Sequence, residues 1–374
     1  MARDSRVAGW HVAVMQQFQT RRDDHSRTRI VEAASPPLGD GEARVRVDSF
    51  AFTANNITYA VAGDRIGYWR FFPALDGSGG GDAEGWGVIP MWGFAEVVES
   101  AVPGLAVGAR VFGYLPPATE LVVRPDRVRP DSFVDASPHR ADLPAAYNRY
   151  SLVEAAGPRA EAERMLLWPL HVTSWALWDS LRDDDWMGAA QVVLTSASSK
   201  TALGLAYALA EDAEAPTSIG LTSPSRTDAV TEFGLYDTVL GYGEEGGLAR
   251  VPTVVVDMSG NTAVLDRIAD HLGGNLVHIW RVGITHWDEA QGGSALVGER
   301  SKMFFAPGHI AKRIGDWGPE RFARESEGFL ARSAEQSRGW LEVKRLDGLD
   351  ALSDVYADVR EGRRAATEGL VIDL

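Results

Sequence analysis

A regular alternation of strand-length apolar runs with helical stretches, from about residue 161 to 312, most constrains the fold of this chain. The runs are rich in Val, Ile, Leu and Thr, and apolar residues recur at helical spacing between them. Because parallel neighbouring strands need a crossover helix, this alternation predicts a doubly wound parallel α/β sheet. The expected strands are Val192–Ser196, Ser218–Thr222, Thr238–Gly241, Thr253–Asp257 and Leu276–Trp280, and the expected helices are Thr201–Glu211, Arg226–Phe233 and Thr262–His271.

The first expected strand runs into a stretch of small residues before its helix begins. A helix N-terminus offers free N–H groups and a positive dipole end to a phosphate, and small residues allow close approach. The usual G-x-G-x-x-G is absent, so an ordinary turn capped by Ser198 or Ser199 is the alternative. A P-loop is excluded because Leu194 and Ser199 stand where its glycines are required. The candidate phosphate-binding residues are Thr195, Ser196, Ala197, Ser198, Ser199, Lys200 and Thr201.

No carboxylate follows the second expected strand, where sheets that prefer NAD place an Asp or Glu for the ribose 2′-hydroxyl. The chain has Thr222, Ser223 and then Arg226 there. An arginine can form charge-assisted bidentate bonds with a 2′-phosphate, and a serine suits the same group. These residues favour NADPH over NADH, and the alternative is a solvated polar cap on the next helix.

Composition limits the possible classes of protein. At 374 residues the chain exceeds the roughly 250–300 at which single cores stop growing, so two domains are expected. A net charge of −15 argues against nucleic-acid binding. Neither a membrane-length apolar run nor a signal-like start is present, so a cytoplasmic protein without a membrane partner is expected. The absence of cysteine excludes disulfides, thiolate nucleophiles and sulfur-ligated zinc.

The first part of the chain is β-rich and suggests a small barrel, with a glycine-rich loop at 76–82. The short apolar strand Gly369–Ile372 cannot stand alone, so we expect it to return to this first domain. The expected division is therefore 1–160 completed by 313–374, with the nucleotide-binding domain at 161–312.

Several motifs, in this order, resemble the medium-chain dehydrogenase/reductase superfamily over nearly the whole chain. Ala54–Tyr59 resembles the N-P-x-D-x-Y turn beside its active site, and Gly93–Ser100 with Gly104–Gly113 is similar to its G-x-G-x-V-x-x-V-G…F-x-V-G-D-R-V-x-G pattern. Gly369–Ile372 is similar to its G-K-x-V-L ending. The resemblance implies a GroES-like β-barrel domain beside a Rossmann-type domain. Without cysteine, the chain resembles the zinc-free quinone-reductase and enoyl-reductase side.

Three segments resemble signatures of an uncharacterised bacterial branch of that superfamily, which supplies a fold but no substrate. They are Thr53–Ala60, Ser196–Ala202 and Gly283–Trp287. The superfamily's members are often dimers joined through the edge strand of the nucleotide domain, so a homodimer is possible here.

Candidate catalytic residues lie on one turn and one loop. Asn55, Thr58 and Tyr59 cluster, and a tyrosine hydroxyl can hydrogen-bond or protonate a developing oxyanion. The alternative is that Tyr59 only packs. By resemblance, His286 lies in a loop that borders the nicotinamide, although most lone histidines are structural or exposed.

Further candidates also come from the resemblance or from clusters of aromatic residues. Thr173 matches a threonine that touches the nicotinamide end, or it caps a helix start, and Tyr242 falls where the superfamily lines its 2′-phosphate pocket. Barrel packing is the alternative explanation for Tyr68 and Trp69. The candidate substrate-lining residues are Tyr68, Trp69, Tyr147 and Tyr150.

These observations predict an NADPH-dependent oxidoreductase that transfers hydride to an activated C=C or C=O bond without zinc. The many aromatic residues of the first domain suggest a small apolar or aromatic substrate. The alternative is a non-catalytic nucleotide-binding or ligand-sensing protein on the same fold, because function resides in the site.

Overall fold

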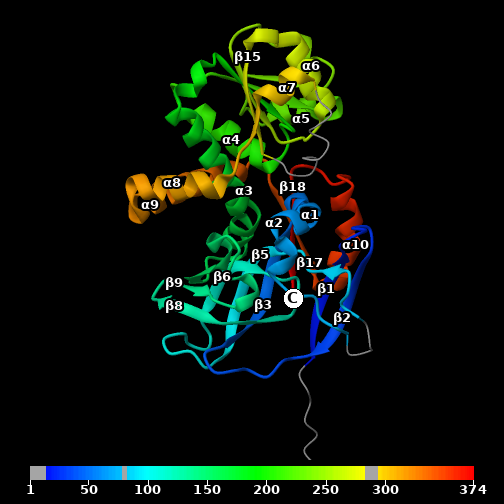
Figure 1. Ribbon diagram of the computed structural model, residues 1–374, viewed down its shortest axis with the longest axis vertical. Helices are drawn as coiled ribbons and strands as arrows, with labels where there is room; N and C mark the ends of the chain where they lie inside the picture. Colours follow the sequence, from blue (N-terminus) through cyan, green and yellow to red (C-terminus); the bar gives the residue numbers. More distant parts are fainter. Residues whose placement is uncertain (1–13, 78–81, 283–293) are drawn as a thin grey trace, which may run out of the picture.

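A six-stranded parallel sheet forms one part of the molecule (Figure 1). The computed structural model describes residues 14–77, 82–282 and 294–374. Strands β11 (Gln191–Thr195) and β14 (Thr253–Asp257) are buried along their whole length, as expected for central strands covered on both faces. The strand order is β13 (Thr238–Gly241), β12 (Thr217–Thr222), β11 (Gln191–Thr195), β14 (Thr253–Asp257), β15 (Leu276–Arg281) and β16 (Ser301–Met303).

This order confirms the doubly wound sheet, because the chain moves outward from β11 to one edge and then from β14 to the other. All five strands expected from the sequence are present, with ends shifted by one residue at most. The helices are α4 (Lys200–Glu211), α5 (Thr227–Glu232), α6 (Thr262–Leu272) and α7 (Ala295–Arg300), with the short 3-10 turns η4 (Asp185–Gly188), η5 (Pro224–Arg226), η6 (Glu245–Gly247) and η7 (Gly273–Asn275).

A nine-stranded mixed sheet and a three-stranded sheet form the other part of the molecule. The larger sheet runs β17 (Glu342–Asp347), β18 (Glu368–Asp373), β3 (Ala43–Phe52), β5 (Met91–Ser100), β6 (Arg110–Leu115), β10 (Arg149–Val153), β9 (Ser132–Asp135) and β8 (Pro125–Arg129), with β7 (Glu120–Val123) also paired to β3. The smaller one runs β2 (Thr28–Ala34), β1 (Val14–Arg21) and β4 (Trp86–Gly87). Short helical segments here are α1 (Ala54–Val61), α2 (Gly63–Ile66), η1 (Tyr68–Arg70), η2 (Pro138–Arg140) and η3 (Ala145–Asn148).

The last strand returns to the first part of the chain, as expected from the sequence. β18 pairs antiparallel with β3, and β17 pairs parallel with β18 through the crossover helix α10 (Gly348–Arg360). The helices α8 (Ala306–Trp317) and α9 (Pro319–Ser337) instead pack against α3 (Pro158–Asp183) and lie beside the parallel-sheet part (Figure 1). The expected boundary at residue 313 therefore falls inside α8, and the domain limits stay a prediction.

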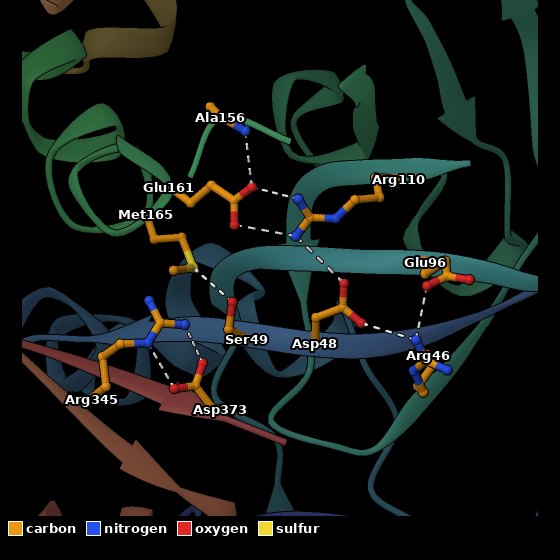
Figure 2. A network of polar contacts seen from close by, with 10 residues as sticks. All are labelled: Arg46, Asp48, Ser49, Glu96, Arg110, Ala156, Glu161, Met165, Arg345 and Asp373. Carbon is orange, nitrogen blue, oxygen red and sulfur yellow. Dashed lines mark hydrogen bonds and ion pairs between the residues drawn. The ribbon is translucent and has the colours of Figure 1, made fainter. Parts of the chain in front are cut away.

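The 26-residue helix α3 connects the two parts, and a polar network fixes its first turns (Figure 2). Arg110 of β6 donates to Glu161 of α3 and lies 3.6 Å from Asp48 of β3. The Ser49 hydroxyl lies 3.6 Å from the Met165 sulfur one turn further along. The start of α3 is thereby held on the mixed sheet. Within the described ranges, no helix combines the length and hydropathy of a membrane span.

Replacing Glu161 with Gln tests this attachment. Partial burial pushes the pKa of Glu161 up, but hydrogen bonds from Arg110 and from the Ala156 N–H outweigh it and leave the pKa lowered. Because its folded pKa is lowered, ionised Glu161 stabilises the fold at pH values above its ordinary pKa of 4.5. This stability is lost as the pH falls through the folded pKa. In urea unfolding at pH 7 we expect Glu161→Gln to cost about 1–2 kcal/mol, with the difference from wild type shrinking below about pH 4.5.

The matched control is Glu99→Gln, which removes the same charge from the exposed partner of Arg44. Exposed pairs contribute little, so this change is expected to stay within about 0.5 kcal/mol. Equal effects of the two substitutions would show that Glu161 does not anchor α3.

Candidate functional site

A cleft of about 420 Å³ lies where the parallel-sheet part meets the mixed-sheet part. It is at the carboxyl ends of β11 and β14, through Ser196 and Met258, where the strand order changes direction. Ligands of open α/β sheets bind at this point. Its other walls come from α1, from Pro169–Thr173 of α3, from 304–307 and from the segment 362–370 that precedes and enters β18.

The loop after β11 adopts its conformation without glycine. Ser196 has a φ of 48°, in the left-handed region that favours glycine. Its N–H donates to the Tyr242 hydroxyl at 2.9 Å, and the Tyr236 hydroxyl donates to the Ala197 carbonyl at 2.9 Å. Ser199 caps α4 by accepting from the Ala202 N–H. Two phenols and a serine cap therefore fix a loop that the sequence marks only by its small residues.

Lys200 has a different role from the phosphate ligand expected from the sequence. Its ammonium donates to the carbonyl oxygens of Ala366 at 2.9 Å and Glu368 at 2.7 Å. Burial lowers the pKa of Lys200 to about 8, although the negative charge of Glu368 acts to raise it. Lys200 lines the cleft, but its donors hold the C-terminal segment against the start of α4.

The structure places Arg226 against Ser198 of the loop after β11, whereas Ser223, which the sequence suggests beside Arg226 for the 2′-phosphate, does not line the cleft. Arg226 donates to the Ser198 hydroxyl at 3.3 Å and to the Gly362 carbonyl at 3.4 Å. Both residues line the cleft, together with Ser199 and Thr201.

Arg364 also lines this end of the cleft, and the sequence reasoning missed it. It is held 2.6 Å from the Glu368 carboxylate. The sequence shows two adjacent arginines, Arg363 and Arg364, just before the terminal strand. The expected division assigns them to the GroES-like domain and not to the nucleotide-binding domain. Lys200, Arg226 and Arg364 make this end cationic in a chain of net charge −15.

Several expected phosphate ligands shape the site without lining it. The Thr195 hydroxyl donates to Asp257 at 2.7 Å and accepts from the Met258 N–H at 2.9 Å, which fastens the end of β11 to that of β14. The Thr222 carbonyl accepts from the Tyr242 N–H, and the Ser223 carbonyl accepts from the Arg226 N–H. The residues that support the loop or neighbouring turns from outside the cleft are Thr195, Ala197, Thr222, Ser223 and Tyr242.

The other end of the cleft is lined by hydroxyl and amide side chains with aromatic faces. Asn55, Thr58 and Tyr59 come together on α1, a helix that starts with a reciprocal cap between Thr53 and Asn56. Tyr68 packs on Tyr59 with ring centroids 4.5 Å apart.

Tyr147 completes this end, with its hydroxyl 3.4 Å from that of Tyr68. Burial raises the pKa of Tyr59, Tyr68 and Tyr147, so all three phenols stay neutral near pH 7 and act as hydrogen-bond donors.

Trp69 and Tyr150 do not line the cleft, which corrects the expectation for both. Trp69 fills the space beside Gly63, where a Cβ would lie 2.0 Å from its indole nitrogen. Tyr150 is fully buried, and its hydroxyl donates to the Tyr114 carbonyl and accepts from Arg140. Barrel packing explains both residues.

Thr173 and His286 are the remaining candidates that the sequence predicts. Thr173 lines the cleft from the middle of α3, where its hydroxyl donates back to Pro169, so it is not a helix cap. His286, with the segment Gly283–Trp287, lies outside the described residues. Phe304 and the exposed Phe305 were not expected and form part of the rim. In the described ranges, no cluster of three His, Asp or Glu side chains can hold a metal ion.

The contact of Lys200 with the C-terminal segment predicts a specific pH dependence. A folded pKa of about 8 lies below the unfolded value of 10.5, so between these values the unfolded chain binds more protons and stability rises with pH. The free energy of unfolding of wild type relative to Lys200→Met is therefore expected to increase by about 1–3 kcal/mol from pH 8 to 10.5. Urea unfolding of both proteins measures it, and a constant difference would mean that Lys200 titrates normally.

Comparison with known proteins gives relatives by fold. No curated protein matches the sequence. The structure of CurA from Vibrio vulnificus in complex with NADPH is 11% identical, with a TM-score of 0.60 over 96% of this chain and 98% of that one. The quinone oxidoreductase from Coxiella burnetii is 15% identical, with a TM-score of 0.53 over 97% and 100%. The yhdH oxidoreductase from Salmonella enterica in complex with NADP is 12% identical, with a TM-score of 0.53 over 96% and 99%.

These likenesses confirm the expected fold, a Rossmann-type parallel sheet with a GroES-like domain. The profile of one protein family also matches residues 50–365, which is most of the chain. The chain therefore belongs to the family described as "Protein of unknown function (DUF2855)".

Proposed function

We propose that this protein is an NADPH-dependent oxidoreductase that acts on an activated C=C or C=O bond of a small apolar or aromatic substrate, without zinc. The observation that carries this proposal is that one cleft has a cationic end at the start of α4 and a neutral phenolic end at α1. A phosphate-bearing cofactor and an uncharged carbonyl compound need these two environments side by side.

The cationic end fits the phosphates of NADPH. The first turn of α4 has N–H groups without helical partners, and the Ser198 and Ser199 hydroxyls lie beside it. Arg226 suits the 2′-phosphate, because it lies against Ser198 and no carboxylate follows β12. Arg364 suits the diphosphate. The CurA and yhdH structures contain NADPH and NADP respectively, which is consistent with this assignment.

The chain's own groups perform the remaining tasks. Bound NADPH supplies a hydride. Thr173 borders the middle of the cleft, and the rings of Tyr68 and Tyr147 exclude water from the substrate end. The neutral Tyr59 phenol donates a hydrogen bond to the substrate oxygen and gives up its proton as negative charge develops there. Zinc is not required by this scheme, and the chain has no cysteine to bind it.

A second candidate function is binding of the nucleotide without turnover. It is favoured by the loop that has no glycine and by Lys200, whose donors are occupied by carbonyl oxygens. NADPH oxidation with quinones, enones, enoyl thioesters and aldehydes separates the two candidates. Binding without oxidation supports the second candidate, and failure of both NADPH and NADH to shift the melting temperature contradicts both.

Three further points extend the proposal. We place the nucleotide-binding domain at 161–312 and the GroES-like domain at 1–160 with 313–374, since β17 and β18 join the mixed sheet. The homodimer and the cytoplasmic location expected from the sequence stay predictions.

Replacing Arg226 with Ala tests the assignment of the 2′-phosphate. Affinity for NADPH is expected to fall by roughly 1.5–3 kcal/mol, as for a hydrogen bond to a charged group, with little change for NADH. Titration calorimetry with both nucleotides measures the difference. Arg250→Ala is the control, because the same charge is removed from an exposed residue near the amino end of β14. Equal losses for NADPH and NADH would contradict the assignment.

Replacing Tyr59 with Phe tests the proton donor. The rate of hydride transfer is expected to fall by about 100-fold or more, because the developing charge loses its donor, while NADPH affinity holds. Stopped-flow absorbance of NADPH measures the rate. Tyr150→Phe is the control: its hydroxyl is bound inside the barrel, so stability should fall without slowing the reaction. Unchanged turnover in Tyr59→Phe would remove Tyr59 from the mechanism.

A further inference from the structure

Two buried donors without partners lie beside Tyr59. Neither the Trp92 indole N–H nor the Tyr114 hydroxyl has a hydrogen-bond partner in the part of the chain that the structure describes. Trp92 is 6% exposed and Tyr114 is fully buried. Most buried polar groups in folded proteins are paired, because an unpaired one costs free energy. Two such groups beside one functional phenol require an explanation.

The mixed sheet places these two donors together. Trp92 on β5 and Tyr114 on β6 are directly paired across the strands, and their rings lie 5.1 Å apart. The Tyr114 ring meets the Tyr59 ring edge-on, with centroids 5.7 Å apart. Neither Trp92 nor Tyr114 lines the cleft, whereas Tyr59 does. Tyr59 therefore stands between the cleft and this pair of donors.

Among the residues that the structure describes, no cation lies near enough to Tyr59 to stabilise a phenolate. The titratable groups that face it are the phenols of Tyr68, Tyr114 and Tyr147, and burial raises the pKa of Tyr59 well above its ordinary value. Trp92, Asn55 and Tyr114 approach the Tyr59 hydroxyl as hydrogen-bonding side chains and lower its pKa, although the donors of Trp92 and Tyr114 do not reach hydrogen-bond geometry with it. Hydrogen-bond donors are thus the available means of making this phenol a better acid.

We propose that Trp92 and Tyr114 are positioning residues that donate hydrogen bonds to the Tyr59 oxygen as it loses its proton, and this rests on the proposed function. The Tyr59 O–H bond breaks, the proton goes to the substrate oxygen, and the electron pair stays on Tyr59. The indole N–H and the Tyr114 hydroxyl then share the negative charge, and a proton from water restores the phenol. Donors fixed in advance stabilise charge without reorganisation during the reaction.

The test uses Trp92→Phe and Tyr114→Phe, which remove the donors and keep aromatic rings. Each is expected to lower kcat for NADPH-dependent reduction roughly 10- to 100-fold. KM for NADPH should hold, and the solvent deuterium isotope effect on kcat should grow as proton transfer becomes slower. The melting temperature should hold or rise, because an unpaired buried group has been removed.

Two controls separate this role from packing. Tyr356→Phe removes another buried hydroxyl without a partner, between Phe18 and Phe52, and is expected to leave kcat and the isotope effect unchanged. In a Tyr59→Phe background, Trp92→Phe and Tyr114→Phe should cause no further loss, because both act through Tyr59.

Three results would overturn the inference in an active wild-type enzyme. They are an unchanged kcat in both single variants, a fall in melting temperature that accompanies the loss of activity, and a full further loss in the Tyr59→Phe background. A wild type that reduces none of the four substrate classes would instead contradict the proposed function itself.

Discussion

The cleft depends on the contact between the Lys200 ammonium and the carbonyl oxygens of Ala366 and Glu368. A buried ammonium must place its protons on acceptors. Here the acceptors are Ala366, just before β18, and Glu368, the first residue of β18, which belongs to the mixed sheet. The first turn of α4 and the last strand of the chain are therefore held together by one side chain. Arg364 reaches the cleft on the same segment, where the Glu368 carboxylate offsets part of the repulsion among three cations.

A loop without glycine changes how a phosphate can be recognised. In a glycine-rich turn, backbone freedom and small size let N–H groups meet the diphosphate directly. Here Ser196 takes up the left-handed conformation, at a strain of about 1 kcal/mol, and its N–H is already bonded to Tyr242. In the proposed complex, the phosphates are therefore recognised by the serine hydroxyls, the first turn of α4 and the two arginines. Hydrogen bonds with Tyr242 and Tyr236 hold the loop in one conformation, although it has no glycine.

The sequence predicts the parallel sheet closely because its central strands are apolar on both faces and short turns bound them, as in Thr253–Asp257. It cannot decide between Tyr147 and Tyr150, which lie three residues apart. Tyr147 belongs to η3 and lines the cleft, whereas Tyr150 is the second residue of β10 and is buried in the barrel. Composition also cannot predict that Arg364 lines the cleft, because the pairing of β18 with β3 brings this residue there. The sequence pattern around a residue predicts whether its side chain is buried. Whether that side chain lines the cleft depends on contacts between segments that lie far apart in the sequence.

The separation of charge along the cleft has a consequence for what can bind. Lys200, Arg226 and Arg364 all lie toward α4, whereas the described walls around Tyr59 present phenols, an amide and a threonine hydroxyl. A negatively charged group placed among these neutral donors would lose its hydration without gaining a cation, which is unfavourable. An uncharged carbonyl compound loses less hydration and can accept from Tyr59. In the proposed mechanism, the same absence of a cation from the described walls leaves the buried donors of Trp92 and Tyr114 to stabilise the Tyr59 oxygen once its proton has gone.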